Sequence, residues 1–326
     1  MKLTRGKKIT LWIVGIILFI ILGLGVGTYI YANSLLNKME KVEIDKEEVG
    51  ITEDVKEKLT QYDDTITNIA LFGVDAEDGQ AGRSDSIMIA TIDTHNKKLK
   101  LTSIMRDSYV NIDGHGLDKI NHAYAFGNAQ LAIKTLNENF DLNIEDFVAV
   151  NFSSLPKIID EIGGIELDID SEELKYINGY IKNINTVNST SSPEIVSVGT
   201  QHVDGSLAMA YCRIRYTSGG DYKRTERHRE VLSKIFEKIL NMSPTTYQSL
   251  LNDLLPMVST NLDGSEIMEL GNKILKIGNT TLEQERFPRD GYCEGQMING
   301  TYYLNFDKEA TIEQLHNYIF EDKIIW

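Results

Sequence analysis

The chain has 326 residues and a formal net charge of −15, and 42% of its residues are hydrophobic and 25% are charged. This is the composition of a globular protein, which excludes a collagen-like chain, a low-complexity disordered chain and a membrane protein with many spans. The acidic balance gives no support to nucleic-acid binding, because that function needs a basic footprint for phosphates.

An uncharged run of 23 residues, Ile9–Tyr31, follows a short basic segment at the start of the chain. As a helix it would be about 34 Å long, which is enough to cross a hydrocarbon core of roughly 30 Å. The alternatives are a buried core helix and a cleaved signal peptide, whose apolar segment is shorter, at roughly 7–15 residues. We expect a retained transmembrane helix over 9–31, with residues 1–8 as a cytoplasmic tail and the rest of the chain outside the cell.

Residues 32–67 are polar and charged, and they predict a partly helical stalk between the membrane and a domain over 68–326. From Asn68 onward the pattern changes to short apolar runs that are rich in β-branched residues and bounded by Gly or Asp. Such runs are typical of buried strands. The first three are Ile69–Val74, Ser86–Ile92 and Leu99–Met105.

Helices and further strands follow along the chain. The spacing of apolar residues predicts helices over 128–140, 153–162, 205–211, 224–240 and 263–277, and strands over 147–150 and 165–169. The polar stretch Asn178–Ser192 predicts a flexible surface loop. This order predicts an α/β fold, in which a mixed central sheet is flanked by helices in an α-β-α layered domain.

Several common catalytic motifs are missing from the sequence. It contains no phosphate-binding P-loop, no dinucleotide-binding glycine motif, no zinc-protease motif and no serine-hydrolase nucleophile motif. The six histidines are scattered, and none is spaced for a zinc site.

Charged residues instead gather at the predicted strand ends. They are Asp75, Arg83, Asp85, Arg106 and Asp107. Two convergent carboxylates suit magnesium or manganese, and arginines suit phosphate because they donate paired hydrogen bonds and stay charged. The pattern predicts a metal-assisted phosphate or pyrophosphate site, with purely structural ion pairs as the alternative.

A second group of charges lies between Cys212 and Glu230. This segment has three more basic than acidic residues, whereas the chain beyond the basic tail has 19 more acidic than basic residues. The local surplus favours an anionic ligand, and a salt-bridged helix face is the alternative. In an extended segment Arg213 and Arg215 would point to one face. In a helix a single face would hold Asp221, Arg224 and His228.

The order of these motifs resembles the LytR-CpsA-Psr family over about residues 68–240. The motifs are Gly73-Val-Asp75, Arg83-Ser-Asp85, Ser103-Ile-Met-Arg106-Asp107, Lys119-Ile-Asn121, Arg213-Ile-Arg215 and Asp221-Tyr-Lys-Arg224-Thr-Glu-Arg227. No single motif is specific, but several in one order are.

The resemblance implies a membrane-anchored, extracytoplasmic phosphotransferase of a Gram-positive-type envelope. Such an enzyme moves a glycopolymer from an undecaprenyl-pyrophosphate carrier to peptidoglycan, at a hydroxyl of N-acetylmuramic acid, and leaves a phosphodiester. The polymer stays open among teichoic acid, capsule and other wall polysaccharides. The resemblance also implies an apolar tunnel for the polyprenyl tail.

The resemblance also implies roles for individual residues. Asp75 and Asp85 would hold magnesium or manganese. The pyrophosphate would be bound by Arg106, Arg213, Arg215, Arg224, Lys119 and His228. Catalytic roles would fall to Arg83, Arg106 and Asp221. His228 stands where the family often has glutamine, and it would still donate to phosphate and become cationic at lower pH.

Two other functions stay open. One is a regulatory module that binds polyprenyl phosphates without chemistry, although paired metal ligands argue against it. The other is a hydrolase that uses water as the acceptor. Cys212 and Cys293 are the only cysteines, and either a disulfide or two separate thiols fits an exterior location.

Overall fold

The structure is a computed structural model that describes residues 38–75, 82–151, 154–241, 253, 255–278 and 282–325. The predicted anchor, Ile9–Tyr31, lies outside these residues. Within the described ranges, no helix is long and apolar enough to cross a membrane.

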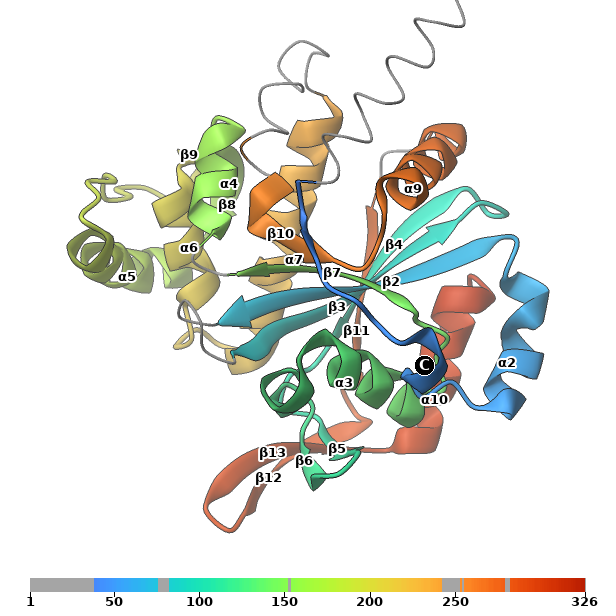
Figure 1. Cartoon of the computed structure of the whole chain (residues 1–326). Coiled ribbons are helices and arrows are strands. Elements are labelled where there is room, and N and C mark those ends of the chain that lie inside the picture. The colour runs from blue at the N-terminus through green and yellow to red at the C-terminus, as the bar shows by residue number, and fades with distance from the viewer. Residues whose placement is uncertain are drawn as a thin grey trace, which may run out of the picture.

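A mixed seven-stranded sheet forms the centre of the molecule (Figure 1). Its strands, in spatial order, are β1 (Glu40–Lys41), β10 (Val258–Thr260), β7 (Asp146–Asn151), β2 (Ile66–Asp75), β3 (Arg83–Asp93), β4 (Lys98–Ile104) and β11 (Leu282–Phe287). β3 runs antiparallel to both of its neighbours, β2 and β4, whereas β7 runs parallel to β2 and β11 runs parallel to β4.

Among the described residues, three two-stranded antiparallel sheets lie outside this sheet, and in the second of them a helix, α5 (Ser171–Asn188), connects the two strands. They are β5 (Tyr109–Ile112) with β6 (Gly116–Lys119), β8 (Ile165–Ile169) with β9 (Gly199–Val203), and β12 (Cys293–Ile298) with β13 (Thr301–Phe306). The α-helices are α2 (Glu53–Leu59), α3 (His122–Phe140), α4 (Leu155–Glu161), α5 (Ser171–Asn188), α6 (Gly205–Arg213), α7 (Gly220–Leu240), α9 (Gly264–Ile277) and α10 (Lys308–Phe320). Short 3₁₀ helices are η1 (Lys46–Glu48), η2 (Thr60–Tyr62) and η3 (Leu255–Met257).

Side chains alternate between the two faces of the central strands, and each face packs against helices. Ala70 and Phe72 of β2 belong to a core shared with α2, α3 and α10. On the other face, Ile92 and Leu99 pack against α7 and α9. A separate core joins α4, α5, α6 and α7 to the β8–β9 strand pair. The predicted α/β fold, with a mixed sheet flanked by helices, is confirmed.

The described part of the predicted stalk is partly helical, as expected, but it packs into the domain. β1 pairs with β10 in the central sheet, and Val49 and Leu59 are buried in the main core. Thr52 caps α2 by accepting a hydrogen bond from the backbone N–H of Val55. Only a few isolated apolar residues of this segment are buried in the core. Its highly charged sequence therefore gave no sign that the segment is part of the folded domain.

The predicted loop over 178–192 is wrong for residues 178–188, because α5 continues to Asn188, whereas residues 189–192 lie outside any helix or strand. The helix begins with a capping box between Asp170 and Glu173. Ile177, Ile181 and Ile184 are buried at helical spacing, while polar residues fill the exposed face. The many polar residues of this segment favoured a loop in the sequence analysis, although the isoleucines have helical spacing.

Arg227 is a buried cation that ties three segments together. Its Nε donates to Glu173 Oε1 at 2.7 Å, its Nη1 to the Ile214 carbonyl at 3.1 Å and its Nη2 to Thr217 at 2.7 Å. These contacts join α7 to α5 and to the turn after α6. That turn carries Arg215, so the ion pair holds part of the site described below.

We expect Arg227→Ala to lower the free energy of unfolding by about 3–5 kcal/mol, because it leaves the Glu173 carboxylate buried without its partner. Urea denaturation of the purified domain measures the change. The control is Lys223→Ala, which removes an exposed α7 cation paired with Glu226 at 3.0 Å and is expected to cost less than about 1 kcal/mol. Equal losses in the two variants would contradict the role of Arg227.

Candidate functional site

The ends of three central strands bring the predicted charges together. β2 ends at Asp75, which pairs with Arg83 at the start of β3, and both side chains are exposed. Asp85 follows two residues later. β4 ends at Ile104 beside Ile87 of β3, and Arg106 follows two residues later. One edge of the sheet therefore holds all of these groups.

Arg106 lies among three carboxylates. Its Nη1 donates to Asp85 Oδ2 at 2.8 Å, its Nη2 lies 3.2 Å from Asp221 Oδ1, and its Nε lies 3.6 Å from Asp107 Oδ2. The guanidinium is largely buried, and these carboxylates raise its pKa despite the burial. Arg106 is thus a charged centre that fixes the relative positions of residues from β3, α7 and the turn after β4.

Arg224 lies behind the same carboxylates. Its Nε is 3.5 Å from Asp221 Oδ1, and its Nη2 is 3.8 Å from Asp85 Oδ2. Only 4% of its side chain is exposed. Burial lowers the pKa of Arg224, and the nearby positive charges of Arg106 and Arg215 lower it further. The carboxylates around Arg224 therefore compensate its charge incompletely, and an added anion would be favourable.

Asp85 connects the two arginines. Burial alone would raise its pKa, but the charges of Arg106 and Arg224 outweigh burial and hold the pKa below its usual range. Its Oδ1 accepts a hydrogen bond from Asn121 Nδ2 at 3.2 Å, at the start of α3. Asp85 is thus an ionised carboxylate in a fixed position.

A cavity of about 240 Å³ opens beside this network. It is lined by Asp75, Asp85, Tyr180, Met209, Cys212, Arg213, Arg215, Arg224 and His228. Six of these were predicted as site residues, and they come from distant parts of the sequence. Arg83, Arg106, Lys119 and Asp221 are not in the lining. The sequence analysis missed Tyr180 and Met209, and the isoleucine spacing of α5 was the signal that could have placed Tyr180 on a helix.

The segment with Arg213 and Arg215 is only partly extended. Arg213 is the last residue of α6, and Ile214 then adopts an extended conformation and is fully buried. Burial of Ile214 leaves both arginines exposed, and both line the cavity. The sequence predicted that the two arginine side chains lie on the same side. They do so because the helix ends at Arg213 and the next residue is extended, not because the segment is a strand. The predicted helical face with Asp221 and Arg224 is confirmed on α7.

Lys119 does not line the cavity and contacts Asp107 instead. Its Nζ donates to Asp107 Oδ1 at 2.6 Å. Asp107 in turn lies beside Arg106. In this structure Lys119 therefore supports the carboxylate that faces Arg106.

A second, apolar cavity of about 400 Å³ adjoins the first, and Cys212 and His228 line both. Its walls come from β2, β3 and β7 of the sheet and from α4 and α7, with η3 and β10 at one side. The apolar lining includes Leu71, Phe72, Met88, Val148, Leu155, Ile158, Val231, Leu232, Ile235, Ile239 and Leu255. A charged cavity thus continues into an apolar one.

His228 stands at the junction between the two cavities. Its Nε2 donates to the Cys212 carbonyl at 3.2 Å. Burial lowers the pKa of His228 to about 3, and the charge of Arg224 adds to the effect. This pKa favours a neutral ring at mildly acidic pH, in contrast to the expected cationic histidine.

Both cysteines are free thiols. Cys212 is buried in α6, and burial raises its pKa to about 12. Cys293 at the start of β12 contacts the Tyr222 hydroxyl at 3.3 Å. Of the two alternatives, this structure has the separate thiols.

The carboxylates of the cavity fit a hard cation. Asp75 and Asp85 line the same space, although the described part of the chain has no cluster of three or more His, Cys, Asp or Glu residues able to hold a metal. Magnesium needs no such cluster, because it keeps several waters and takes further oxygens from substrate phosphates. Two carboxylates in a cavity that is also lined by arginines are consistent with this mode of magnesium binding.

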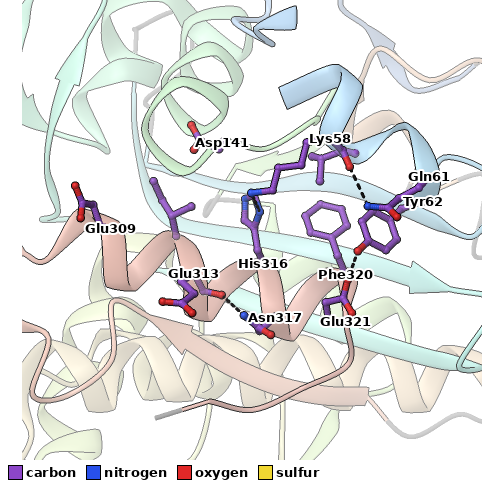
Figure 2. A pocket seen from close by; sticks show the side chains of 12 residues that line it. Lys58, Gln61, Tyr62, Asp141, Glu309, Glu313, His316, Asn317, Phe320 and Glu321 are labelled. Atoms are coloured by element: carbon purple, nitrogen blue, oxygen red, sulfur yellow. Dashed lines mark hydrogen bonds between the residues drawn. The ribbon is translucent and has the colours of Figure 1, made fainter. Parts of the chain in front are cut away.

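A third cavity, of about 410 Å³, lies between α10 and the α2–η2 segment (Figure 2). Figure 2 shows His316 and Phe320 facing Lys58 and Tyr62 across it. It contains none of the predicted site residues. It lies near the start of β2, whereas the charged cavity lies at the end of that strand.

Comparisons with known proteins agree with this geometry. The model of the LytR_cpsA_psr family matches residues 26–319. The chain is 30% identical to the polyisoprenyl-teichoic acid–peptidoglycan teichoic acid transferase TagU of Enterococcus faecalis, over 89% of this chain and 92% of that protein. It is also 30% identical to the TagU of Bacillus cereus, over 95% of this chain and 96% of that one.

Solved structures show the same fold. The structure of TagT bound to LIIa-WTA superposes with a TM-score of 0.61 at 27% identity and covers 78% of this chain and 91% of that one. The structure of the LytR-CPS2A-psr family protein YwtF (TagT) with bound octaprenyl pyrophosphate lipid has a TM-score of 0.57 at 27% identity, over 78% and 90% of the two chains. The chain belongs to the LytR-CpsA-Psr family and is an enzyme of the phosphotransferase type.

Proposed function

We propose that this enzyme transfers a phosphate-linked glycopolymer from a polyprenyl-pyrophosphate carrier to peptidoglycan. The observation that carries the proposal is the junction of a cationic cavity with an apolar one at Cys212 and His228. A polyprenyl pyrophosphate has a doubly charged head and a long apolar tail, and the two cavities match these parts. The octaprenyl pyrophosphate bound to a structural neighbour supports this assignment.

Three arginines are the proposed pyrophosphate ligands. Arg213 and Arg215 are exposed and line the cavity, so they can reach an incoming ligand. Arg224 is buried in the wall of the same cavity, and burial together with the charges of Arg106 and Arg215 lowers its pKa, which supports a role for an anion beside it. Phosphate oxygens would supply the missing negative charge through paired hydrogen bonds. His228 would contribute as a neutral donor or acceptor, not as a charge.

Asp75 and Asp85 would hold magnesium or manganese, which would offset charge on the pyrophosphate when bound. Arg106 would act mainly by positioning, since its nitrogens already face Asp85, Asp107 and Asp221. Lys119 would support the network through Asp107. Arg83 is exposed beside Asp75 and would contact the transferred phosphate at the cavity mouth.

The reaction is a displacement at phosphorus. The hydroxyl oxygen of the acceptor would bond to the phosphorus that bears the glycopolymer, and the bond from that phosphorus to the bridging oxygen would break. Polyprenyl phosphate would leave with the electron pair, and the hydroxyl proton would pass to a carboxylate such as Asp221. Catalysis of this kind rests on positioning and charge neutralisation, which a fixed set of arginines and carboxylates supplies.

The proposed setting is the outer face of a cell membrane. The uncharged segment Ile9–Tyr31 would anchor the domain beside its lipid-linked donor and raise the effective donor concentration. The proposed carrier is undecaprenyl pyrophosphate, and the proposed acceptor is a hydroxyl of N-acetylmuramic acid. Teichoic acid is the polymer named for the relatives, and capsule and other wall polysaccharides are the alternatives.

The direct test supplies the full chain in detergent with a polyprenyl-pyrophosphate-linked disaccharide, a peptidoglycan fragment and magnesium. Mass spectrometry then follows release of polyprenyl phosphate and attachment of sugar phosphate to the fragment. Attachment supports the transferase. Release without attachment would indicate a hydrolase, and tight binding of the donor without release would indicate a regulatory binding module.

We expect Arg224→Ala to lower kcat/KM for transfer by at least about 100-fold, equivalent to about 2.7 kcal/mol, because it removes a preorganised charge from the phosphate site. The same assay measures the loss. The matched control is Lys234→Ala, an exposed cation on the same helix that pairs with Glu237. A variant that keeps its fold and transfers at the wild-type rate would remove Arg224 from the site.

We expect Leu232→Trp to raise the KM for a long-chain polyprenyl donor by about 10-fold, because the larger ring fills the apolar cavity and costs about 1.4 kcal/mol of binding. A short-chain donor, whose tail does not extend along the cavity, should keep its KM. The control is Phe236→Trp, since Phe236 lies on α7 but packs in the core against α9. An equal effect on short and long donors would place the tail elsewhere.

We expect His228→Gln to make the stability of the protein less sensitive to acid. In the folded protein the pKa of His228 is about 3, whereas in the unfolded chain it returns to about 6.5, so the unfolded state binds the extra proton as the pH falls. This group therefore lowers wild-type stability on acidification by up to about 1.4 kcal/mol per pH unit below pH 6.5.

Urea denaturation at pH 7.5 and pH 5 measures this difference. The free energy of unfolding should fall less for His228→Gln than for the wild type, while the control His95→Gln, at an exposed turn, should match the wild type. An identical fall in all three proteins would show that His228 is accessible to protons in the folded state.

A further inference from the structure

The β12–β13 hairpin is fixed directly to the catalytic network. The backbone N–H of Leu304 in β13 donates to the Asp107 carbonyl at 2.8 Å, and Ser108 forms an isolated bridge with Leu304. Leu304 is buried. The hairpin therefore holds a constant position beside the turn that carries Arg106.

Tyr302 on this hairpin presents its ring at the edge of the network. Its side chain is 44% exposed although it is aromatic. The ring lies against Gly295 of the facing strand, where any Cβ would come within 2.6 Å of the ring. The Lys119 ammonium is 5.9 Å from the ring centre. Partial burial raises the pKa of Tyr302, and the nearby charges of Asp107 and Asp221 raise it further.

Aromatic and polar groups continue outward from Tyr302 in a band of side chains that contact one another. The Lys119 ammonium lies 5.8 Å from the Tyr303 ring, and the Tyr303 hydroxyl is 3.4 Å from Asp118. Asp118 pairs with His122 at 2.8 Å. Figure 1 shows the two hairpins that carry most of these residues, β5–β6 and β12–β13, grouped below α3.

The band ends on an exposed stacked pair. The rings of Phe126 and His115 lie 4.1 Å apart and are inclined by 9°, and the ring of His122 meets Phe126 edge-on at 5.9 Å. Phe126 is 45% exposed, and Leu117 at the neighbouring hairpin is 61% exposed. An exposed patch of this kind, continuous with an active site, is more typical of a binding surface than of a solvated edge.

The chemistry of the band fits sugar rings. The apolar C–H faces of a sugar pack on aromatic faces, and its hydroxyls need carboxylate and imidazole partners at the edges, which Asp118 and His122 supply. Aromatic side chains offer such contact area at a low entropy cost, since they have only two rotatable bonds. A lipid would need a purely apolar surface, and a phosphate would need arginines that the band does not contain.

We propose that this aromatic band, from Tyr302 to Phe126, binds sugar rings of the acceptor glycan and brings its hydroxyl to the network. The inference rests on the proposed transferase function. In a displacement at phosphorus the attacking and leaving oxygens lie roughly in line. The leaving polyprenyl phosphate belongs to the apolar cavity, which meets the site at Cys212 and His228, whereas the band meets the network at Asp107.

Steady-state transfer assays with varied donor and varied acceptor test the proposal. Tyr302→Ala and Phe126→Ala are each expected to raise the KM for a peptidoglycan glycan of several disaccharides by about 10-fold, with kcat and the donor KM unchanged. Tyr302→Phe, which keeps the ring, should restore the wild-type KM. The control is Leu275→Ala, an exposed apolar residue on α9 outside the band. An unchanged acceptor KM in both alanine variants would overturn the proposal, and a raised donor KM would reassign the band to the donor sugar.

Binding of the same peptidoglycan glycan without donor, measured by calorimetry, separates this inference from the proposed function. Failure of the wild type to transfer would count against the transferase. Loss of glycan binding in Tyr302→Ala and Phe126→Ala, with unfolding transitions like that of the wild type, would still support the band. Wild-type binding in both variants would overturn it.

Discussion

The ion pairs around Arg106 are the interaction on which the site depends. One guanidinium faces carboxylates from β3, from the turn after β4 and from α7, so it joins the sheet edge to the helix that carries Arg224. A buried cation of this kind is stable only while its partners stay in place. Arg224 lies farther from the same carboxylates, at 3.5 Å from Asp221 and 3.8 Å from Asp85, and burial lowers its pKa. The same carboxylates therefore contact Arg106 closely and Arg224 more loosely, which is the basis for proposing Arg224 as an anion ligand.

The motifs predicted much of the site because its chemistry is concentrated in charged residues at strand ends. Asp75, Asp85 and Arg224 were predicted from spacing and resemblance, and they line one cavity in the structure. The separate duties of Arg106 and Lys119 could not be predicted, since they depend on which carboxylates lie within about 4 Å in space. Tyr180 was missed because α5 is polar on its exposed face and was interpreted as a loop.

The fold followed from hydrophobic periodicity wherever strands were buried, as in β2, β3 and β4. The segment 38–67 shows where this signal fails. Its helix has only Val55 and Leu59 buried, and its strand β1 has two residues. Each contact is small, but together they close an edge of the sheet through β10 and cover α3. Packing of this kind is decided by tertiary contacts, which local charge and composition do not report.

His228 lies at the boundary between the charged cavity and the apolar cavity. A cationic imidazole there would add to the positive field of Arg224 and would lose solvation in the apolar cavity. The protein instead keeps the ring neutral, with Nε2 donating to the Cys212 carbonyl. A neutral imidazole has a donor, an acceptor and apolar faces, so it suits the boundary between a charged cavity and an apolar one. Burial thus allows a histidine at this position without a second positive charge beside Arg224.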